Sequence, residues 1–314
     1  MNSIIQVEQI SRTFGSITAV DGISLSVEEG EVFGVLGPNG SGKTTLVRLL
    51  AGVLAPTGGA AYLFGKDVTR EGVYVRQRIG VLTETPSLYE RLTARKNLAF
   101  FARLSGIPDA EVAGRVDAIL SLMNLADRAD DLAGGFSKGM KQRLAVARAL
   151  IHDPQIVFLD EPTSGLDPEA SRQVTGIIRE MAADRGKTIF LCTHNLGQAQ
   201  DLCSRVAMLS AGRILAQGSR DDLSERLWDA VPLEIEFQGP PPAGVLEAIV
   251  RIAGVTLENR AGATITLRVQ HRHQVPAVIR AAVGQGGDIV RVSPREYSLE
   301  EIYFAVQDQG RNAA

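Results

Sequence analysis

The sequence has few cysteines, no long apolar run and no excess of charge of one sign. Cys192 and Cys203 lie too far apart for a CxxC redox or zinc pair, and we interpret both as packing residues. Gly, Asp or Arg interrupts every apolar stretch before the roughly 18 to 20 residues that a membrane-spanning helix needs. The formal net charge of −3 does not favour nucleic acid as a partner. The N-terminus lacks the basic and apolar regions of a secretion signal, so we expect a cytoplasmic protein.

The length and patterning predict one large domain followed by a small one. With 314 residues and 45% apolar residues, the chain can form a sizeable core. Short apolar runs alternate with longer helical patterns over residues 1–230, which indicates a layered α/β domain. The expected strands are residues 4–10, 23–30, 31–36, 155–160 and 188–193, and the expected helices cover residues 44–54, 141–153 and a helical subdomain at about 85–150.

The composition of the sequence changes where the Gly- and Pro-rich run GPPPAG follows LEIEF, and we place the domain boundary near Ala230. From residue 231 to 314 the expected order is strand, helix, two strands, helix and strand, which matches a small α+β, ferredoxin-like domain. A last amphipathic helix begins after Ser298, with Glu301 in position for a capping box.

A phosphate-binding loop is the strongest chemical signal. The run GPNGSGKT satisfies the P-loop pattern, follows an expected strand and opens an expected helix. The glycines let backbone N–H groups wrap phosphates at the positive end of the helix, Lys43 reaches the β- and γ-phosphates, and the Thr44 hydroxyl ligates Mg²⁺. A Gly-rich turn without ligand is the alternative. The pattern residues are Gly37, Pro38, Asn39, Gly40, Ser41, Gly42, Lys43 and Thr44.

Two adjacent carboxylates end the apolar strand IVFLDE, at the edge where open α/β sheets bind ligands. We expect Asp160 to hold Mg²⁺ and Glu161, on the other side of the pleat, to polarise the attacking water. A strand that ends in a solvated acidic turn is the alternative, and the neighbouring P-loop disfavours it.

Together with other motifs, these residues resemble the ATP-binding cassette (ABC) ATPases over about 220 residues. FSKGMKQR, at residues 136–143, resembles the family's signature motif, SGLD its D-loop, and Thr193-His194 its switch histidine. The aromatic Phe14 matches the residue that stacks on adenine. The resemblance implies that the P-loop residues with Thr45 bind ATP, that Lys43, Glu161 and His194 are catalytic, and that Thr44, Asp160 and Glu84 hold Mg²⁺.

The resemblance also implies a head-to-tail dimer. The helix after the signature motif offers a second positive N-terminus, which in this family faces the nucleotide of the other protomer. Each ATP is then held between Lys43 of one copy and Ser137 and Gly139 of the other, and Asp167 links the two sites. A heterodimer with a sister cassette stays an alternative.

Two departures from the family pattern concern the metal and the γ-phosphate. Glu84 stands where the family has a glutamine, and its carboxylate cannot donate a hydrogen bond unless it is protonated. Lys138 replaces a signature glycine and adds a cation near the γ-phosphate if it points inward. The variant SKGMKQR is similar to ATPases of bacterial exporters, including drug-resistance systems.

We therefore predict an ATPase subunit that powers export through a separate transmembrane permease, at the inner face of the cell membrane. The segment Thr85 to Asn97 is the expected permease-coupling surface, with a solvated loop as its alternative. The alternative function is a soluble ABC ATPase that acts on nucleic acid or ribosomes, whose usual tandem cassettes and coiled coils are absent. A regulatory or dimer-stabilising role is the hypothesis for the C-terminal domain.

Overall fold

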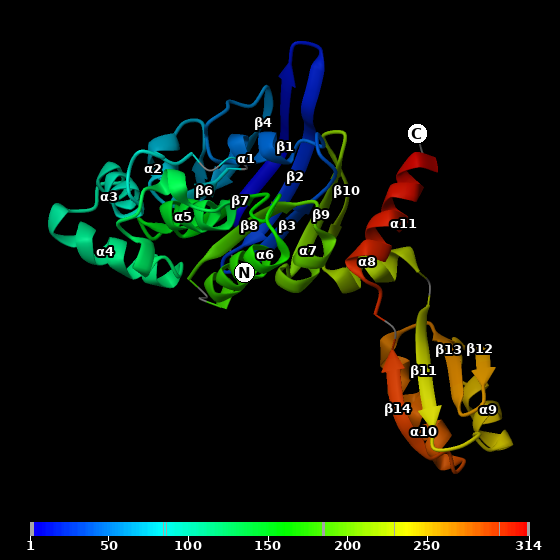
Figure 1. The fold of residues 1–314 in the computed structure, drawn as a ribbon. Helices are drawn as coiled ribbons and strands as arrows, with labels where there is room; N and C mark the ends of the chain where they lie inside the picture. Colours follow the sequence, from blue (N-terminus) through cyan, green and yellow to red (C-terminus); the bar gives the residue numbers. More distant parts are fainter. Residues whose placement is uncertain are drawn as a thin grey trace. The chain divides into compact units, whose positions relative to one another are not determined.

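The computed structural model describes residues 3–83, 85, 87–183, 186–228, 230–294 and 296–312. The chain divides into two compact units, Met1–Ser219 and Arg220–Ala314 (Figure 1). The sequence analysis put this boundary near Ala230, but the structure puts it about ten residues earlier, after Ser219. The reason is that helix α8 (Arg220–Leu227) packs on α11 (Leu299–Asn312) in the second unit. The breaker run that suggested Ala230 therefore lies inside the second unit, after its first strand.

Two sheets form the first unit. Strands β3, β8, β7 and β6 are parallel to one another, β9 pairs parallel with β3, and β10 adds an antiparallel edge. An antiparallel sheet of order β2-β1-β4-β5 packs against it. The strands are β1 (Ser3–Phe14), β2 (Ile17–Glu28), β3 (Val32–Leu36), β4 (Gly58–Leu63), β5 (Lys66–Asp67), β6 (Ile79–Leu82), β7 (Ile156–Asp160), β8 (Thr188–Thr193), β9 (Arg205–Ser210) and β10 (Arg213–Gly218).

Helices cover the six-stranded sheet, and its central strands are buried throughout because both of their faces are covered. One apolar core lies between the two sheets around α1, and a second joins α3, α4, α5 and α6 to the other face. The helices are α1 (Lys43–Leu50), α2 (Gly72–Arg76), α3 (Ala94–Leu104), α4 (Asp109–Leu122), α5 (Lys138–Leu150), α6 (Pro168–Ala183) and α7 (Leu196–Leu202), with short turns η1 (Ala126–Arg128) and η2 (Ala133–Gly135).

The second unit has the expected ferredoxin-like order. Its antiparallel sheet runs β12-β13-β11-β14, and apolar residues on one face pack against α9 and α10. Glu301 accepts the backbone N–H of Ser298 and Ser298 accepts that of Glu301, so the predicted capping box is present. The elements are β11 (Val231–Phe237), α9 (Ala243–Val250), β12 (Val255–Ala261), β13 (Thr264–Val269), η3 (Arg272–Gln274), α10 (Val275–Gly284) and β14 (Ile289–Pro294).

Both cysteines are packing residues, as the sequence suggested. Cys192 is buried in β8, and Cys203 contacts the backbone of β3, where a Cβ on Gly34 would lie 2.8 Å from its sulfur. Burial raises the pKa of the Cys203 thiol to about 12 and raises that of Cys192 as well. Both thiols therefore stay protonated at neutral pH. None of the helices in the described part of the chain is long and apolar enough to cross a bilayer.

Candidate nucleotide site

The loop between β3 and α1 has a backbone that only glycine can form at several positions. Gly40 and Gly42 have φ angles of +80° and +109°. A Cβ on Gly42 would lie 2.4 Å from the carbonyl oxygen of Ala19, and one on Gly37 would lie 2.3 Å from that of Leu209. The glycines therefore let the loop pack against neighbouring backbone while it turns into α1.

This loop borders a cavity of about 310 Å³. The N-terminus of α1 opens at the cavity, and the free N–H groups and positive dipole of a helix N-terminus favour phosphate. Most residues around it come from the P-loop, and Glu161 brings a carboxylate from the end of β7. The lining residues are Ala19, Asn39, Gly40, Gly42, Lys43, Thr44, Thr45 and Glu161.

Lys43 is buried at the base of this cavity. Its ammonium donates to the carbonyl oxygens of Gly37, at 2.7 Å, and Pro38, at 3.2 Å, and lies 3.2 Å from Oε1 of Glu161. The lysine and glutamate side chains are 5% and 8% exposed, so their charges interact in a poorly hydrated place. The general-base candidate and the predicted phosphate-binding lysine therefore form a buried ion pair.

Glu161 also contacts the predicted switch histidine. Oε2 of Glu161 lies 2.8 Å from Nδ1 of His194, and the backbone N–H of Glu161 donates to the carbonyl of Cys192. The φ angle of Glu161 is +51°, which is unusual for a residue with a side chain. Such strain gathers at functional sites, where the surrounding structure enforces it. The structure therefore brings Lys43, Glu161 and His194 together.

The predicted metal ligands offer oxygen donors, which Mg²⁺ prefers. Thr44 lines the cavity beside Lys43, and Asp160 is 1% exposed at the carboxyl end of β7, one residue before Glu161. A buried carboxylate and a hydroxyl next to a phosphate-binding loop fit this metal. Glu84, the third predicted ligand, lies outside the described residues.

Other predicted nucleotide-binding residues lie away from the cavity lining. Phe14, at the end of β1, is 43% exposed, and the guanidinium of Arg12 lies 4.6 Å from its ring centroid. Ser137 is the N-cap of α5 and accepts the N–H of Met140 at 3.2 Å. Asp167 accepts the N–H of Ala170 at 2.9 Å and so begins α6. These residues do not line the cavity that the P-loop borders within one copy.

Two buried glutamines join the motif segments, and the sequence reasoning assigned them no role. Gln142 of α5 donates to the carbonyl of Pro162 at 2.8 Å, directly after Glu161. Gln198 lies 3.3 Å from the hydroxyls of Thr163 and Thr193. Thr163 follows Glu161 by two residues, and Thr193 directly precedes His194. The sequence signal that could have identified Gln142 and Gln198 is a polar residue at a helix position where an apolar, core-facing residue is expected.

A third buried amide shapes the loop before α3. Asn97 is 1% exposed, accepts the N–H of Tyr89 and donates to the carbonyls of Tyr89, Leu92 and Thr93. Its four hydrogen bonds fix residues 89–93 within the segment predicted to couple to a permease, where Tyr89, Glu90 and Arg91 remain exposed.

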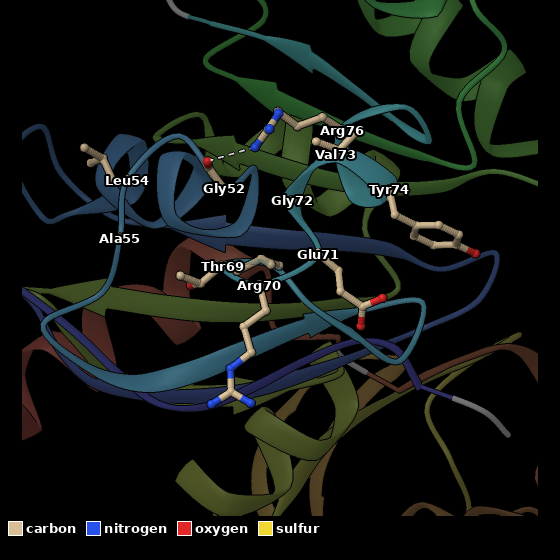
Figure 2. Close-up of a pocket in the computed structure, with 11 residues that line it drawn as sticks. Gly52, Leu54, Ala55, Thr69, Arg70, Glu71, Gly72, Val73, Tyr74 and Arg76 are labelled. Atoms are coloured by element: carbon tan, nitrogen blue, oxygen red, sulfur yellow. Dashed lines mark hydrogen bonds between the residues drawn. The ribbon is translucent and has the colours of Figure 1, made fainter.

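Three adjoining surface hollows, which together we call the groove, lie along α2 and α3 of the first unit. Its first part, of about 410 Å³, lies between the end of α1 and α2, where Arg76 donates to the carbonyl of Gly52 and the exposed side chain of Arg70 points away from Arg76 (Figure 2). Val73 and Arg76 also line the next hollow, and Leu104 links that hollow to a third one over α3. Exposed apolar residues gather here: Val73, Tyr74, Phe100 and Leu104.

The fold and the site define a P-loop nucleotide-binding protein. The family model described as ABC transporter matches residues 20–164. A daunorubicin resistance ATP-binding protein of Streptomyces coeruleorubidus is 35% identical over 99% of this chain and 98% of its own. A Nod factor export ATP-binding protein of Paraburkholderia xenovorans is 38% identical over 96% and 95%. A solved dimer of a bacterial ABC transporter cassette is 25% identical, with a TM-score of 0.64 over 68% of this chain and 98% of its own.

The chain belongs to the ATP-binding proteins of ABC transporters. It is an ATPase whose hydrolysis is coupled to transport, and the curated relatives match both of its units rather than the cassette alone.

Proposed function

We propose that this chain powers export through a separate transmembrane permease, by binding and hydrolysing ATP at a site shared by two copies. The observation that carries the proposal is the contact of Lys43 and His194 with the two oxygens of Glu161, at the edge of the P-loop cavity. The export relatives support this function over a soluble ATPase that acts on nucleic acid or ribosomes.

Each residue of the site has a role in this proposal. The P-loop amides and Lys43 bind the phosphates, and Thr44 and Asp160 hold Mg²⁺, which neutralises phosphate charge when bound. Glu161 accepts a proton from the attacking water, and His194 orients that carboxylate and contacts the γ-phosphate. Because the ammonium of Lys43 lies 3.2 Å from Oε1 of Glu161, a γ-phosphate bound by Lys43 also lies close to the proton acceptor.

The second half of the site comes from another copy. Ser137, Gly139 and Asp167 do not line the P-loop cavity, although the N-terminus of α5 is suited to bind phosphate. The dimeric structure of a related cassette supports a dimer. We infer that its two copies are head to tail, as the family resemblance implies, so that each nucleotide lies between Lys43 of one copy and Ser137 of the other. ATP closes this dimer, and loss of the γ-phosphate opens it.

The substitution Glu161→Gln tests the site and the dimer together. It keeps the shape of the side chain but removes the proton acceptor, so turnover should fall by about a hundredfold or more while ATP still binds. Size-exclusion chromatography with ATP and Mg²⁺ should then show a dimer. Glu111→Gln, on the exposed face of α4, is the matched control and should hydrolyse ATP like the parent. A Glu161→Gln variant that binds ATP, stays monomeric and keeps full turnover would contradict the proposal.

The groove along α2 and α3 is the proposed permease contact, and a chain bound to a permease there lies at the inner face of the membrane. Exposed apolar side chains lie there together with the cations Arg70, Arg76, Lys96 and Arg103. This mixture fits an amphipathic cytoplasmic segment of a membrane protein that carries acidic residues. The groove extends well beyond the predicted segment Thr85 to Asn97.

A negative charge introduced in the groove tests this contact. Leu104, which is 71% exposed, links two hollows, so Leu104→Glu should release the protein from sedimenting membranes while the purified variant keeps its ATPase activity. Leu122→Glu places the same charge on α4, outside the groove, and should leave sedimentation unchanged. Equal sedimentation of the two variants would exclude the groove as the attachment site.

A further inference from the structure

One buried amide connects the two loops that carry the catalytic candidates. The side chain of Gln198, on α7, lies in a residue that is only 6% exposed. Its Oε1 accepts hydrogen bonds from the hydroxyls of Thr163 and Thr193, each at 3.3 Å. One threonine belongs to the loop after Glu161, and the other is the residue before His194. A single oxygen atom therefore bridges the segment after β7 and the segment at the end of β8.

The same amide is fixed from a third side. Nε2 of Gln198 donates to Oγ1 of Thr175 on α6, at 3.2 Å. The backbone N–H of Gln198 donates to the side chain of Asn195, the N-cap of α7, at 3.0 Å. Asn195 in turn donates its backbone N–H to Oγ1 of Thr193. Because both the side chain and the backbone of Gln198 are bonded, the bridging oxygen keeps its position relative to α6 and the start of α7.

The contact that depends on this bridge is the one between Glu161 and His194. Oε2 of the glutamate lies 2.8 Å from Nδ1 of the histidine and 3.4 Å from the backbone nitrogen of the same residue. The φ angle of Glu161 is +51°, a conformation that persists only where the surroundings enforce it. The N–H of Glu161 donates to Cys192, and the Gln198 bridge joins the same two segments directly after that bond.

Packing alone does not explain an amide at this position. Helix α7 packs on α6, β3 and β8, and a side chain buried among them is ordinarily apolar, because a buried amide costs free energy unless it is hydrogen-bonded. Replacing an amide and its partners together by apolar groups of the same shape can be nearly neutral. We therefore expect the Gln198 network to contribute geometry to the site rather than net stability to the fold.

We propose that Gln198 is a positioning residue for ATP hydrolysis, which acts through Glu161 and His194. This inference rests on the proposed roles of Glu161 as proton acceptor and His194 as its orienting partner. Gln198 is not among the residues that line the P-loop cavity, so its effect on the reaction passes through the two loops that it bridges. A displacement of about 1 Å in a reacting group can cost about a hundredfold in rate, so loss of the bridge slows turnover without weakening nucleotide binding.

The test compares Gln198→Met with Gln198→Glu. Methionine has a similar length but neither donates nor accepts these hydrogen bonds well, so turnover should fall about tenfold, while the KM for ATP and the dissociation constant of ADP change less than twofold. Glutamate keeps an acceptor for Thr163 and Thr193, and the hydroxyl of Thr175 can rotate to donate to its second oxygen. Gln198→Glu should therefore restore most of the turnover, which phosphate release measures.

The Glu161→Gln background separates positioning from a general disturbance of the fold. Once the proton acceptor is absent, its position no longer matters, so Gln198→Met should not lower the residual turnover of Glu161→Gln further. Val174→Ala is the matched control, since Val174 is fully buried beside Thr175 on α6. Its cavity should lower the midpoint of urea denaturation while turnover stays that of the parent.

Two results would overturn the role of Gln198 and leave the proposed function intact. One is a Gln198→Met variant that turns over ATP like the parent. The other is an equal loss of rate with and without the Glu161 carboxylate, because Gln198 would then act through the fold as a whole. Full turnover of Glu161→Gln by itself would instead remove the proposed function, and this inference with it.

Discussion

The ammonium of Lys43 lies 3.2 Å from Oε1 of Glu161, and both side chains are almost completely buried. Lys43 is the first residue of α1, directly after the P-loop, and Glu161 follows the end of β7, so the pair joins the two motifs of the site. Removing one partner of a buried ion pair leaves the other charge without compensation, which costs more than removing both.

A double-substitution cycle should therefore show strong coupling between the two residues. We expect Lys43→Met to lower the free energy of unfolding by about 3 kcal/mol, because the Glu161 carboxylate stays buried without a cation. Lys43→Met with Glu161→Gln should recover most of this loss in urea denaturation. If the double variant is as unstable as Lys43→Met alone, the pair is not the cause.

His194 should affect catalysis rather than nucleotide binding. Its ring is hydrogen-bonded to Glu161 but is 53% exposed, so its removal leaves the buried core unchanged. We expect His194→Ala to lower ATP turnover at least tenfold while the dissociation constant of ADP changes less than twofold. Phosphate release and equilibrium binding measure the two quantities. A variant with unchanged turnover would remove His194 from the proposed mechanism.

Two glycine substitutions should change stability in opposite directions. Gly42→Ala combines a φ angle of +109° with a contact to Ala19, and we expect a loss of about 2 kcal/mol or more, together with loss of ATP binding. Gly114 lies inside α4 with open space around it, so Gly114→Ala should stabilise the protein by about 0.5 to 1 kcal/mol. Denaturation midpoints give both values, and a shift in the same direction for both would refute the distinction.

His152 should make stability depend on pH. Burial lowers the pKa of this histidine from 6.5, although Nε2 is hydrogen-bonded to the carbonyl of Ile79. The unfolded chain therefore binds a proton that the folded chain resists, so this stability is complete above pH 6.5 and is lost as the pH falls below it. Urea midpoints at pH 7.5 and 5.5 should differ less in His152→Gln, which keeps a donor for Ile79. An unchanged pH dependence would assign the effect to other groups.

Several features were predictable from the sequence because they depend on neighbours along the chain. The P-loop between β3 and α1 and the acidic end of β7 each carry their own signal in strand and turn chemistry. The order of elements in the second unit followed from periodicity, and the family resemblance added His194. These features need only local patterns or short spacings.

Other features were decided by packing between distant segments. The observed boundary between the units, after Ser219, differs from the predicted one near Ala230 because α8 packs on α11. Breaker residues such as Gly and Pro do not predict this contact. Gln142 and Gln198 became links within the site only when α5 and α7 packed beside the loop after Glu161.

The sequence by itself determined the P-loop, the strand that delivers Asp160 and Glu161, and the family of the chain. Only the tertiary structure decided which charges neutralise each other, since Lys43 and Glu161 are separated by more than a hundred residues. It also revealed the groove along α2 and α3, and the position of Lys138 beside Gly165. The physical reason is that residue types and spacing specify local backbone geometry, whereas charge pairing and surface shape depend on which segments the fold brings together.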